Sequence, residues 1–146
     1  MIDLITLWFK RAKPTSAHRD LEVQMGVHFE EVHEMLETVQ GKDDSTELLL
    51  KDAREAMKKL ATALKSGTGS VGISDRKEYL DACCDQIVTA VGSAHFAGMQ
   101  IVEAVGRVNG SNWSKFKEDG MPIFDSNGKI AKNPATYKKV DLEGLY

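Results

Sequence analysis

The stretch 18–39, HRDLEVQMGVHFEEVHEMLETV, decides the fold class of this chain. Its apolar side chains recur every three or four positions, which is the spacing of one face of an α-helix rather than the alternation of a strand. The same period continues outward along the chain and predicts helices over residues 3–11, 18–39, 47–65, 74–98 and 99–107. No strand pattern occurs in the first 107 residues. We therefore predict an all-α fold, a four- to five-helix bundle with short loops.

Length and composition indicate one soluble domain, residues 1–146. Of its 146 residues, 42% are hydrophobic and 28% are charged, which is ordinary for a globular protein. The net charge of −3 argues against general nucleic-acid binding. No run reaches membrane-spanning length, and nothing resembles a signal peptide. Cys83 and Cys84 are neighbours on a predicted helix, poorly placed to bridge each other, and are typical of a reducing compartment. We expect a cytoplasmic protein with neither a nucleic-acid nor a membrane partner.

The last part of the chain changes character after residue 107. Turn signals such as Asn109–Asn112 and Asp125–Gly128 replace the helical period. We predict a helical body over residues 1–107 and an irregular tail over 108–146. The tail packs either as an ordered extension or as a small hairpin whose arms are 123–124 and 129–130. From Arg107 to Val140 the chain carries seven Lys and Arg against three Asp and Glu. A basic tail on an acidic body is typical of a protein that binds a polyanion.

Two acidic clusters, EEVHE at 30–34 and EYLDACCD at 78–85, point to a metal ion. On helices, Glu31 and Glu34 share a face, and so do Glu78, Asp81 and Asp85. Stacked acids repel one another unless a cation lies between them. Carboxylate oxygens suit Mg²⁺ or Mn²⁺, and such a site leaves room for phosphate oxygens. Two facing helices would bring four carboxylates together, whereas each cluster taken alone has a solvated helix face as its plainer interpretation.

These clusters and the tail resemble the MazG-like all-α nucleoside triphosphate pyrophosphohydrolases, most closely their small phage-type members. The family motif Glu-Glu-x-x-Glu stands at 30–34, and Glu-x-x-Asp-Ala-x-x-Asp stands at 78–85. An Asn-x-Ser-Asn-Met-Ser-Lys signature is matched by NGSNWSK at 109–115, with Trp113 for Met. Asp-Gly-x-Pro-Ile and Gly-Lys-x-x-Lys follow at 119–123 and 128–132, so the resemblance covers Val23 to Leu142.

The resemblance implies metal-dependent hydrolysis of an NTP or dNTP to a nucleoside monophosphate and pyrophosphate, with Mg²⁺ or Mn²⁺ as cofactor. The implied metal ligands are Glu31, Glu34, Asp81 and Asp85. Glu30 or Glu78 would stand behind them or act as general base, so that the implied catalytic residues are Glu30, Glu31 and Glu78. The tail would complete the pocket by binding substrate through Asn112, Trp113, Lys115, Lys129 and Lys132. A homodimer or homotetramer is implied, in the host cytoplasm if the chain is phage-encoded.

The chain departs from the family pattern at two positions, and other functions stay open beside the implied one. Many family members have Glu where Ala82 stands, and Asp81 would take that role on the same face. Val140-Asp141 replaces Pro-Asp near the end. One alternative is phosphoribosyl-ATP pyrophosphohydrolase of histidine biosynthesis, against which the extended tail favours free nucleotides. Another is a non-catalytic nucleotide-binding or helical interaction module, whose acids would be mere surface.

Overall fold

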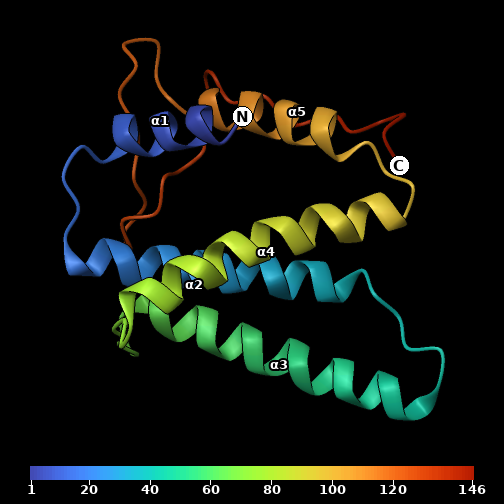
Figure 1. Cartoon of the computed structure of the whole chain (residues 1–146). Helices are drawn as coiled ribbons and strands as arrows, with labels where there is room; N and C mark the ends of the chain where they lie inside the picture. The colour runs from blue at the N-terminus through green and yellow to red at the C-terminus, as the bar shows by residue number, and fades with distance from the viewer. The chain divides into compact units, whose positions relative to one another are not determined.

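The structure, a computed structural model, describes all of residues 1–146 and is all-helical, as predicted. Its helices are α1 (Ile2–Ala12), α2 (His18–Glu37), α3 (Asp44–Ser66), α4 (Arg76–Phe96) and α5 (Ile101–Trp113) (Figure 1). None of them combines the length and the apolar character that crossing a membrane requires.

The chain divides into two compact units, each with its own contacts. The α1–α4–α5 unit comprises Met1–Thr15, Ile73–Phe124 and Ile130–Tyr146. The α2–α3 unit comprises Ser16–Gly72 and Asp125–Lys129. The prediction of one domain over residues 1–146 stays a prediction.

In the α2–α3 unit the two helices run antiparallel, side by side (Figure 1). Val23, Ala61 and Leu64 are buried between them. Gly26 allows the close approach, because a Cβ atom there would lie 3.0 Å from Leu64 Cβ and 3.1 Å from the Ala61 carbonyl oxygen. The apolar face that the period of residues 18–39 predicts therefore packs against the apolar face of α3.

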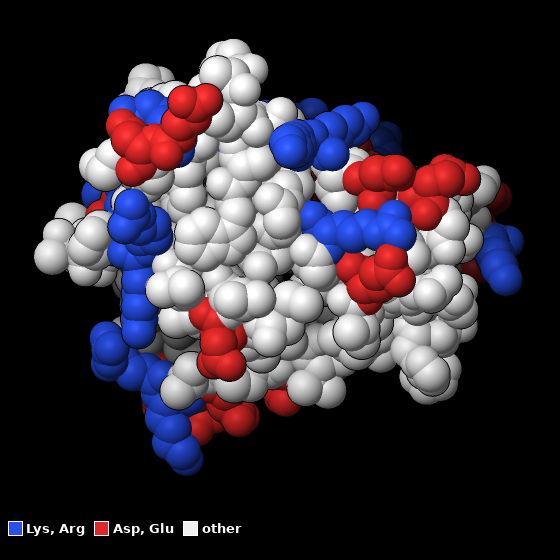
Figure 2. All heavy atoms as spheres, turned by 90° about the horizontal axis from the view of Figure 1, so that it is seen from above, with Lys and Arg blue, Asp and Glu red and all other residues white.

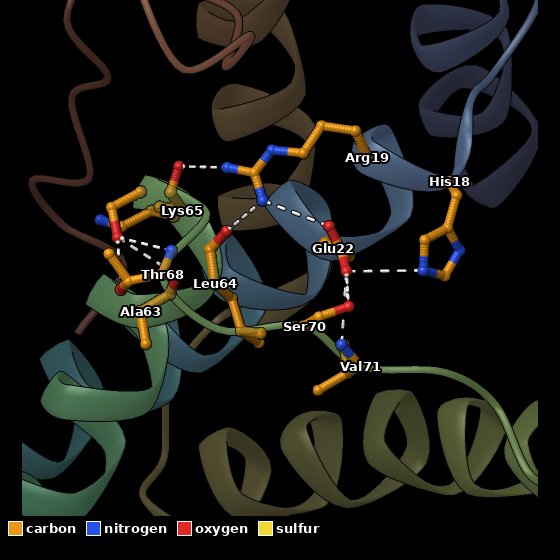
Figure 3. A network of polar contacts seen from close by, with 10 residues as sticks. His18, Arg19, Glu22, Ala63, Leu64, Lys65, Thr68, Ser70 and Val71 are labelled. Carbon is orange, nitrogen blue, oxygen red and sulfur yellow. Dashed lines mark hydrogen bonds and ion pairs between the residues drawn. The ribbon is translucent and has the colours of Figure 1, made fainter.

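Two arginines cap the helix ends of this unit. The last carbonyls of a helix lack intrahelical donors. Arg19 on α2 donates to the Leu64 and Lys65 carbonyls at 2.6 and 2.5 Å (Figure 3). Arg54 on α3 donates to the Leu36 carbonyl at 3.0 Å. Each helix thus closes the carboxyl end of the other, which fixes how far the two are shifted along their axes.

The loop after α3 is tied to α2 through a buried carboxylate. Glu22 is only 7% exposed and accepts hydrogen bonds from Ser70 Oγ at 2.5 Å and from the Val71 amide at 3.4 Å (Figure 3). The Ser70 hydrogen bond is the main reason that the pKa of Glu22 lies below its usual value. Gly67 ends α3 at a φ of 81°, a left-handed conformation that favours glycine. The run of Gly, Ser and Thr at residues 66–70 is typical of a flexible linker, whereas the structure holds this loop against α2.

The α1–α4–α5 unit is built around aromatic rings. Trp8, Ala12 and Phe116 form its buried cluster, and the rings of Trp8 and Phe116 stack with centroids 5.8 Å apart. Trp8 Nε1 donates to the Asn112 carbonyl oxygen at 2.9 Å. Residues near the start of the chain are in this way joined to the end of α5 and to the tail behind it.

The end of α5 and the starts of two helices differ from the prediction. The helical part ends at Trp113, not at Arg107, and the turn predicted at 109–112 is wrong. Packing of α5 against α1, with the Trp8–Asn112 hydrogen bond, outweighs the turn preference of Asn and Gly. The sequence predicts Ser45 or Thr46 as the cap of α3 and Ser74 as the cap of α4. In the structure α3 is capped by Asp43, two residues before Ser45, and α4 by Asp75, one residue after Ser74. An ionised aspartate is as good a cap as serine and also favours the helix dipole.

The predicted hairpin in the tail is confirmed. Phe124 and Ile130 form an antiparallel bridge. The Asp125 amide donates to the Lys129 carbonyl at 2.9 Å, and the Ala131 amide donates to the Ile123 carbonyl at 2.8 Å. The tip of this hairpin, residues 125–129, groups with the α2–α3 unit.

Candidate functional site

Glu31 and Glu34 lie one turn apart on α2, and both are exposed. Neither side chain takes part in a hydrogen bond or an ion pair. No cation therefore relieves the repulsion between them. This half of the predicted metal site has the arrangement that the sequence predicts.

Glu30, the neighbour of Glu31, is held quite differently. It is half-buried and forms ion pairs with Lys65 on α3 and with Lys129 at the hairpin tip, the latter at 2.8 Å. Burial raises the pKa of Glu30, but the hydrogen bonds from Lys129 and Lys65 outweigh burial and leave the pKa below its usual value. Glu30 is thus an anion that fastens the hairpin tip to the α2–α3 unit. To act as a base it would have to release a lysine.

The second cluster lies on α4, and its three acids are exposed. Glu78 faces Lys77 at 3.6 Å, a surface pair between two mobile side chains. Asp81 and Asp85 lie one turn apart and take part in no side-chain hydrogen bond or ion pair. Asp81 and Asp85 therefore lie on the same face of α4. Asp81 could for this reason act as the metal ligand in place of the Glu that many family members have at position 82.

The structure gathers no group of three or more His, Cys, Asp or Glu side chains that could hold a metal ion. The predicted ligands stand instead as two pairs, one on α2 in the α2–α3 unit and one on α4 in the α1–α4–α5 unit. Magnesium is usually held by one or two carboxylates, with water and phosphate oxygens completing its shell. Each pair therefore has suitable donor chemistry for Mg²⁺, and the convergence of both pairs on one site stays a prediction.

The predicted phosphate-binding lysines all have partners within the chain. Lys129 is paired with Glu30. The Lys132 ammonium lies 5.0 Å from the centre of the Tyr137 ring, and the Lys115 ammonium lies 5.8 Å from the centre of the Trp8 ring. Cation–π contacts of this kind at exposed sites are weak, about 0.5–1 kcal/mol, so a phosphate can compete for the exposed Lys132. Lys129 has the stronger contact to give up.

The two tryptophans, Trp8 and Trp113, have rings that could stack on a base, but they belong to the core or its edge. Trp8 is 7% exposed and is covered by Phe116. Trp113 is half-buried, with its ring edge-on to Phe116 at 5.5 Å. The backbone carbonyl oxygen of Asn112 accepts the hydrogen bond from Trp8 Nε1. Trp113 is the one of the two tryptophans with ring surface left for a base.

Part of the positive charge of the tail is offset by nearby acids. Lys117 pairs with Asp119 at 3.2 Å. Figure 2 shows basic and acidic side chains next to one another on the face it presents, rather than one basic field. A hollow of about 830 Å³ opens at the turn between α2 and α3, and another of about 320 Å³ lies beside Arg107, Lys138 and Lys139. None of the predicted site residues lines either hollow, so a pocket completed by the tail stays a prediction.

Two features of the first cluster escape the sequence. Lys65 binds Glu30 across 35 residues, and no local pattern marks it as the partner. His33 has a buried Nδ1 atom with no hydrogen-bond partner, while its Nε2 lies 3.4 Å from Glu37. A histidine on such a helix normally lies at the surface or has its ring nitrogens hydrogen-bonded, and His33 departs from this at Nδ1. The only hint in the sequence that His33 is unusual is its position between Glu31 and Glu34.

Comparison of the chain with protein-family models, with curated proteins and with solved structures finds no match.

Proposed function

We propose that the chain is a metal-dependent nucleoside triphosphate pyrophosphohydrolase. The proposal is carried by the acidic side chains that form neither an ion pair nor a hydrogen bond. Among these, two neighbours one helical turn apart occur only twice, as Glu31 with Glu34 and as Asp81 with Asp85. Both pairs fall on the motif positions for metal ligands. Keeping two like-charged pairs without cations costs helix stability, and binding a divalent ion would reverse that cost.

The four carboxylates would hold Mg²⁺ or Mn²⁺ by their oxygens. The ion would neutralise phosphate charge and lower the pKa of a bound water. The attacking water oxygen would form a bond to the α-phosphorus while the bridging P–O bond to the β-phosphate breaks. The products are then one nucleoside monophosphate and one pyrophosphate.

Glu78 is the better candidate for the base that takes the proton of the water. Glu30 carries two lysines and a lowered pKa, both of which weaken it as a base. Glu78 is exposed, adjoins the Asp81–Asp85 pair and has only the weak contact with Lys77. Lys115, with Asn112 one turn before it, would bind the phosphates once it leaves the Trp8 ring.

A helical interaction module is the second candidate function. The exposed apolar surface of α4 favours it, because a helix that is apolar on most sides is normally covered. The two functions separate on turnover, since an interaction module releases no pyrophosphate.

The proposal is tested by screening the natural NTPs and dNTPs for pyrophosphate release, with Mg²⁺ and with excess EDTA. We expect release from at least one free nucleotide with Mg²⁺ and none with EDTA. Turnover confined to phosphoribosyl-ATP would assign the histidine-biosynthesis alternative. No release from any substrate would reject the hydrolase.

A further inference from the structure

The hollow of about 320 Å³ beside α5, here called the α5 hollow, has no role in the proposed hydrolase. It is lined by Arg107, Gly110 and Ser111 of α5 and by the segment 138–141 of the tail. All of these residues belong to the α1–α4–α5 unit, so the α5 hollow lies within one compact unit. None of the residues assigned to the metal or to the nucleotide lines it.

Hydrogen bonds fasten the segment 138–141 to α5 at both of its ends. Ser111 Oγ donates to the Lys138 carbonyl at 2.7 Å, and the Lys138 amide donates to Ser114 Oγ at 2.8 Å. At the other end, the Arg107 guanidinium donates to the Asp141 carbonyl at 3.1 Å. The backbone that carries Lys138 and Lys139 is therefore held in place, and the α5 hollow has fixed walls.

Two ammonium groups at the α5 hollow have no partner. Lys138 and Lys139 are exposed, and neither side chain takes part in a hydrogen bond, an ion pair or a ring contact. Arg107 is occupied, since Glu103 accepts two hydrogen bonds from it at 2.5 and 3.1 Å. Asp141 is the one acid of the lining, and its carboxylate accepts the Glu143 amide at 2.9 Å. The uncompensated positive charge therefore comes from the two lysines.

The chemistry of this lining favours a small phosphate. Lysine binds phosphate as a compact point charge, whereas carboxylates are bound best by the planar fork of arginine, which Glu103 occupies here. Gly110 keeps the α5 hollow open, because a Cβ atom there would meet nothing within 4 Å. An extended polyanion is disfavoured, since acidic and basic side chains alternate on the face shown in Figure 2.

We propose that the α5 hollow is a phosphate-binding site, in which Lys138 and Lys139 hold inorganic phosphate or pyrophosphate. Each ammonium offers three N–H donors to the phosphate oxygens. Asp141 limits the affinity, because its negative charge repels the anion. The site needs neither the paired carboxylates nor a nucleotide, so it does not rest on the hydrolase activity.

Amide NMR shifts of the full chain test the site while phosphate, and separately pyrophosphate, is added in EDTA at constant ionic strength. EDTA keeps the paired carboxylates free of metal, so a failure of the proposed hydrolase leaves this measurement unaffected. We expect saturable shifts of the Gly110, Ser111 and Lys139 amides, and the anion with the lower Kd is the better ligand. Shifts that do not saturate with either anion would overturn the proposal.

Lysine substitutions separate the site from a general effect of charge. Lys138→Ala and Lys139→Ala should each raise Kd about three- to fivefold, as expected for one exposed charge contact. Lys58→Ala is the matched control, because Lys58 is an exposed lysine without a partner on α3, and it should leave Kd unchanged. An effect of Lys58→Ala equal to that of the other two would show diffuse attraction and overturn the proposal.

Two further variants change the shape and the charge of the α5 hollow separately. Gly110→Leu keeps every charge but fills the space, and it should weaken binding. Asp141→Asn should lower Kd, because asparagine still accepts the Glu143 amide but no longer repels the anion. Circular dichroism confirms that both variants stay helical. Unchanged binding in Gly110→Leu, or weaker binding in Asp141→Asn, would place the anion elsewhere and overturn the proposal.

Discussion

At the scale of single residues, neighbouring glutamates in the first cluster have opposite surroundings. Glu30 is half-buried between two lysines, and Glu31 is exposed without a partner. Sequence reasoning gives both a place in the site because both fall on the motif. It does not find the division between them, since the lysines come from positions 35 and 99 residues away. The exposed pairs on α2 and α4 follow from helical spacing alone.

Replacing Glu30 should change how stability depends on pH. Because the pKa of Glu30 is lowered on folding from its usual 4.5, its contribution is fully present above that pH. The contribution is lost as the pH falls through the folded-state pKa. We expect Glu30→Gln to lower the free energy of unfolding at pH 7 by about 1–2 kcal/mol, with partial exposure reducing the usual value of charged hydrogen bonds. The difference from wild type should shrink toward about pH 3.5.

Urea unfolding at the two pH values measures this effect. Glu31→Gln is the matched control, because it is adjacent, exposed and unpaired. It should change stability by less than about 0.5 kcal/mol at either pH. Equal effects of the two substitutions at pH 7 would show that the Glu30 ion pairs do not stabilise the fold.

Removing one acid of the α4 pair should abolish the response to metal. Mg²⁺ that binds only the folded chain stabilises it increasingly as its concentration exceeds Kd, so wild-type Tm should rise with Mg²⁺. We expect Asp81→Asn to remove that rise and the turnover. In EDTA the variant should be as stable as wild type or more so, by about 0.2–0.5 kcal/mol, because repulsion from Asp85 is relieved.

Asp52→Asn is the control for this experiment, since Asp52 is an exposed acid on α3 outside both clusters, and Glu55, the acid one turn away, is already paired with Lys59. It should keep both the rise in Tm and the turnover. If the Asp81→Asn variant also keeps the Mg²⁺-dependent rise in Tm and the turnover, the Asp81–Asp85 pair is not part of a metal site.

At the scale of elements, the α2–α3 contact depends on a missing side chain. Gly26→Ala should destabilise the fold by about 1–3 kcal/mol, because its Cβ would approach the Ala61 carbonyl and Leu64 within 3.1 Å. Gly92→Ala on α4 meets nothing within 4 Å and should stabilise the helix by up to about 1 kcal/mol. Thermal unfolding of the two variants measures the contrast. A stabilising Gly26→Ala would show that the helices are less closely packed than described.

The elements themselves are largely predictable from the apolar period. All five predicted helices and the tail hairpin are present, although several helix ends differ from the predicted ones. The error at the end of α5 has a tertiary cause, since α1 supports residues whose local preference is for a turn. The arginine caps have no sequence signal either, because each arginine acts on a helix distant along the chain.

At the scale of the whole molecule, two units carry one acidic pair each. The sequence predicts that both pairs act on one substrate, and the tail lysines supply candidate phosphate contacts that are now occupied by Glu30, Trp8 and Tyr137. In the proposed hydrolase, those lysines would have to exchange partners in order to bind the phosphates of a nucleotide. Saturating nucleotide should accordingly weaken the Glu30–Lys129 link, which the nitrogen chemical shift of the Lys129 ammonium reports. An unchanged shift at saturation would exclude Lys129 from phosphate binding.

The central claim, hydrolysis between the α- and β-phosphates with a metal ion, is tested most directly by ³¹P NMR of a turnover in ¹⁸O-water with Mg²⁺. We predict one nucleoside monophosphate and one pyrophosphate for each triphosphate consumed, with the ¹⁸O label in the monophosphate and no reaction in excess EDTA. Nucleoside diphosphate and orthophosphate as first products, or full activity in EDTA, would contradict the account.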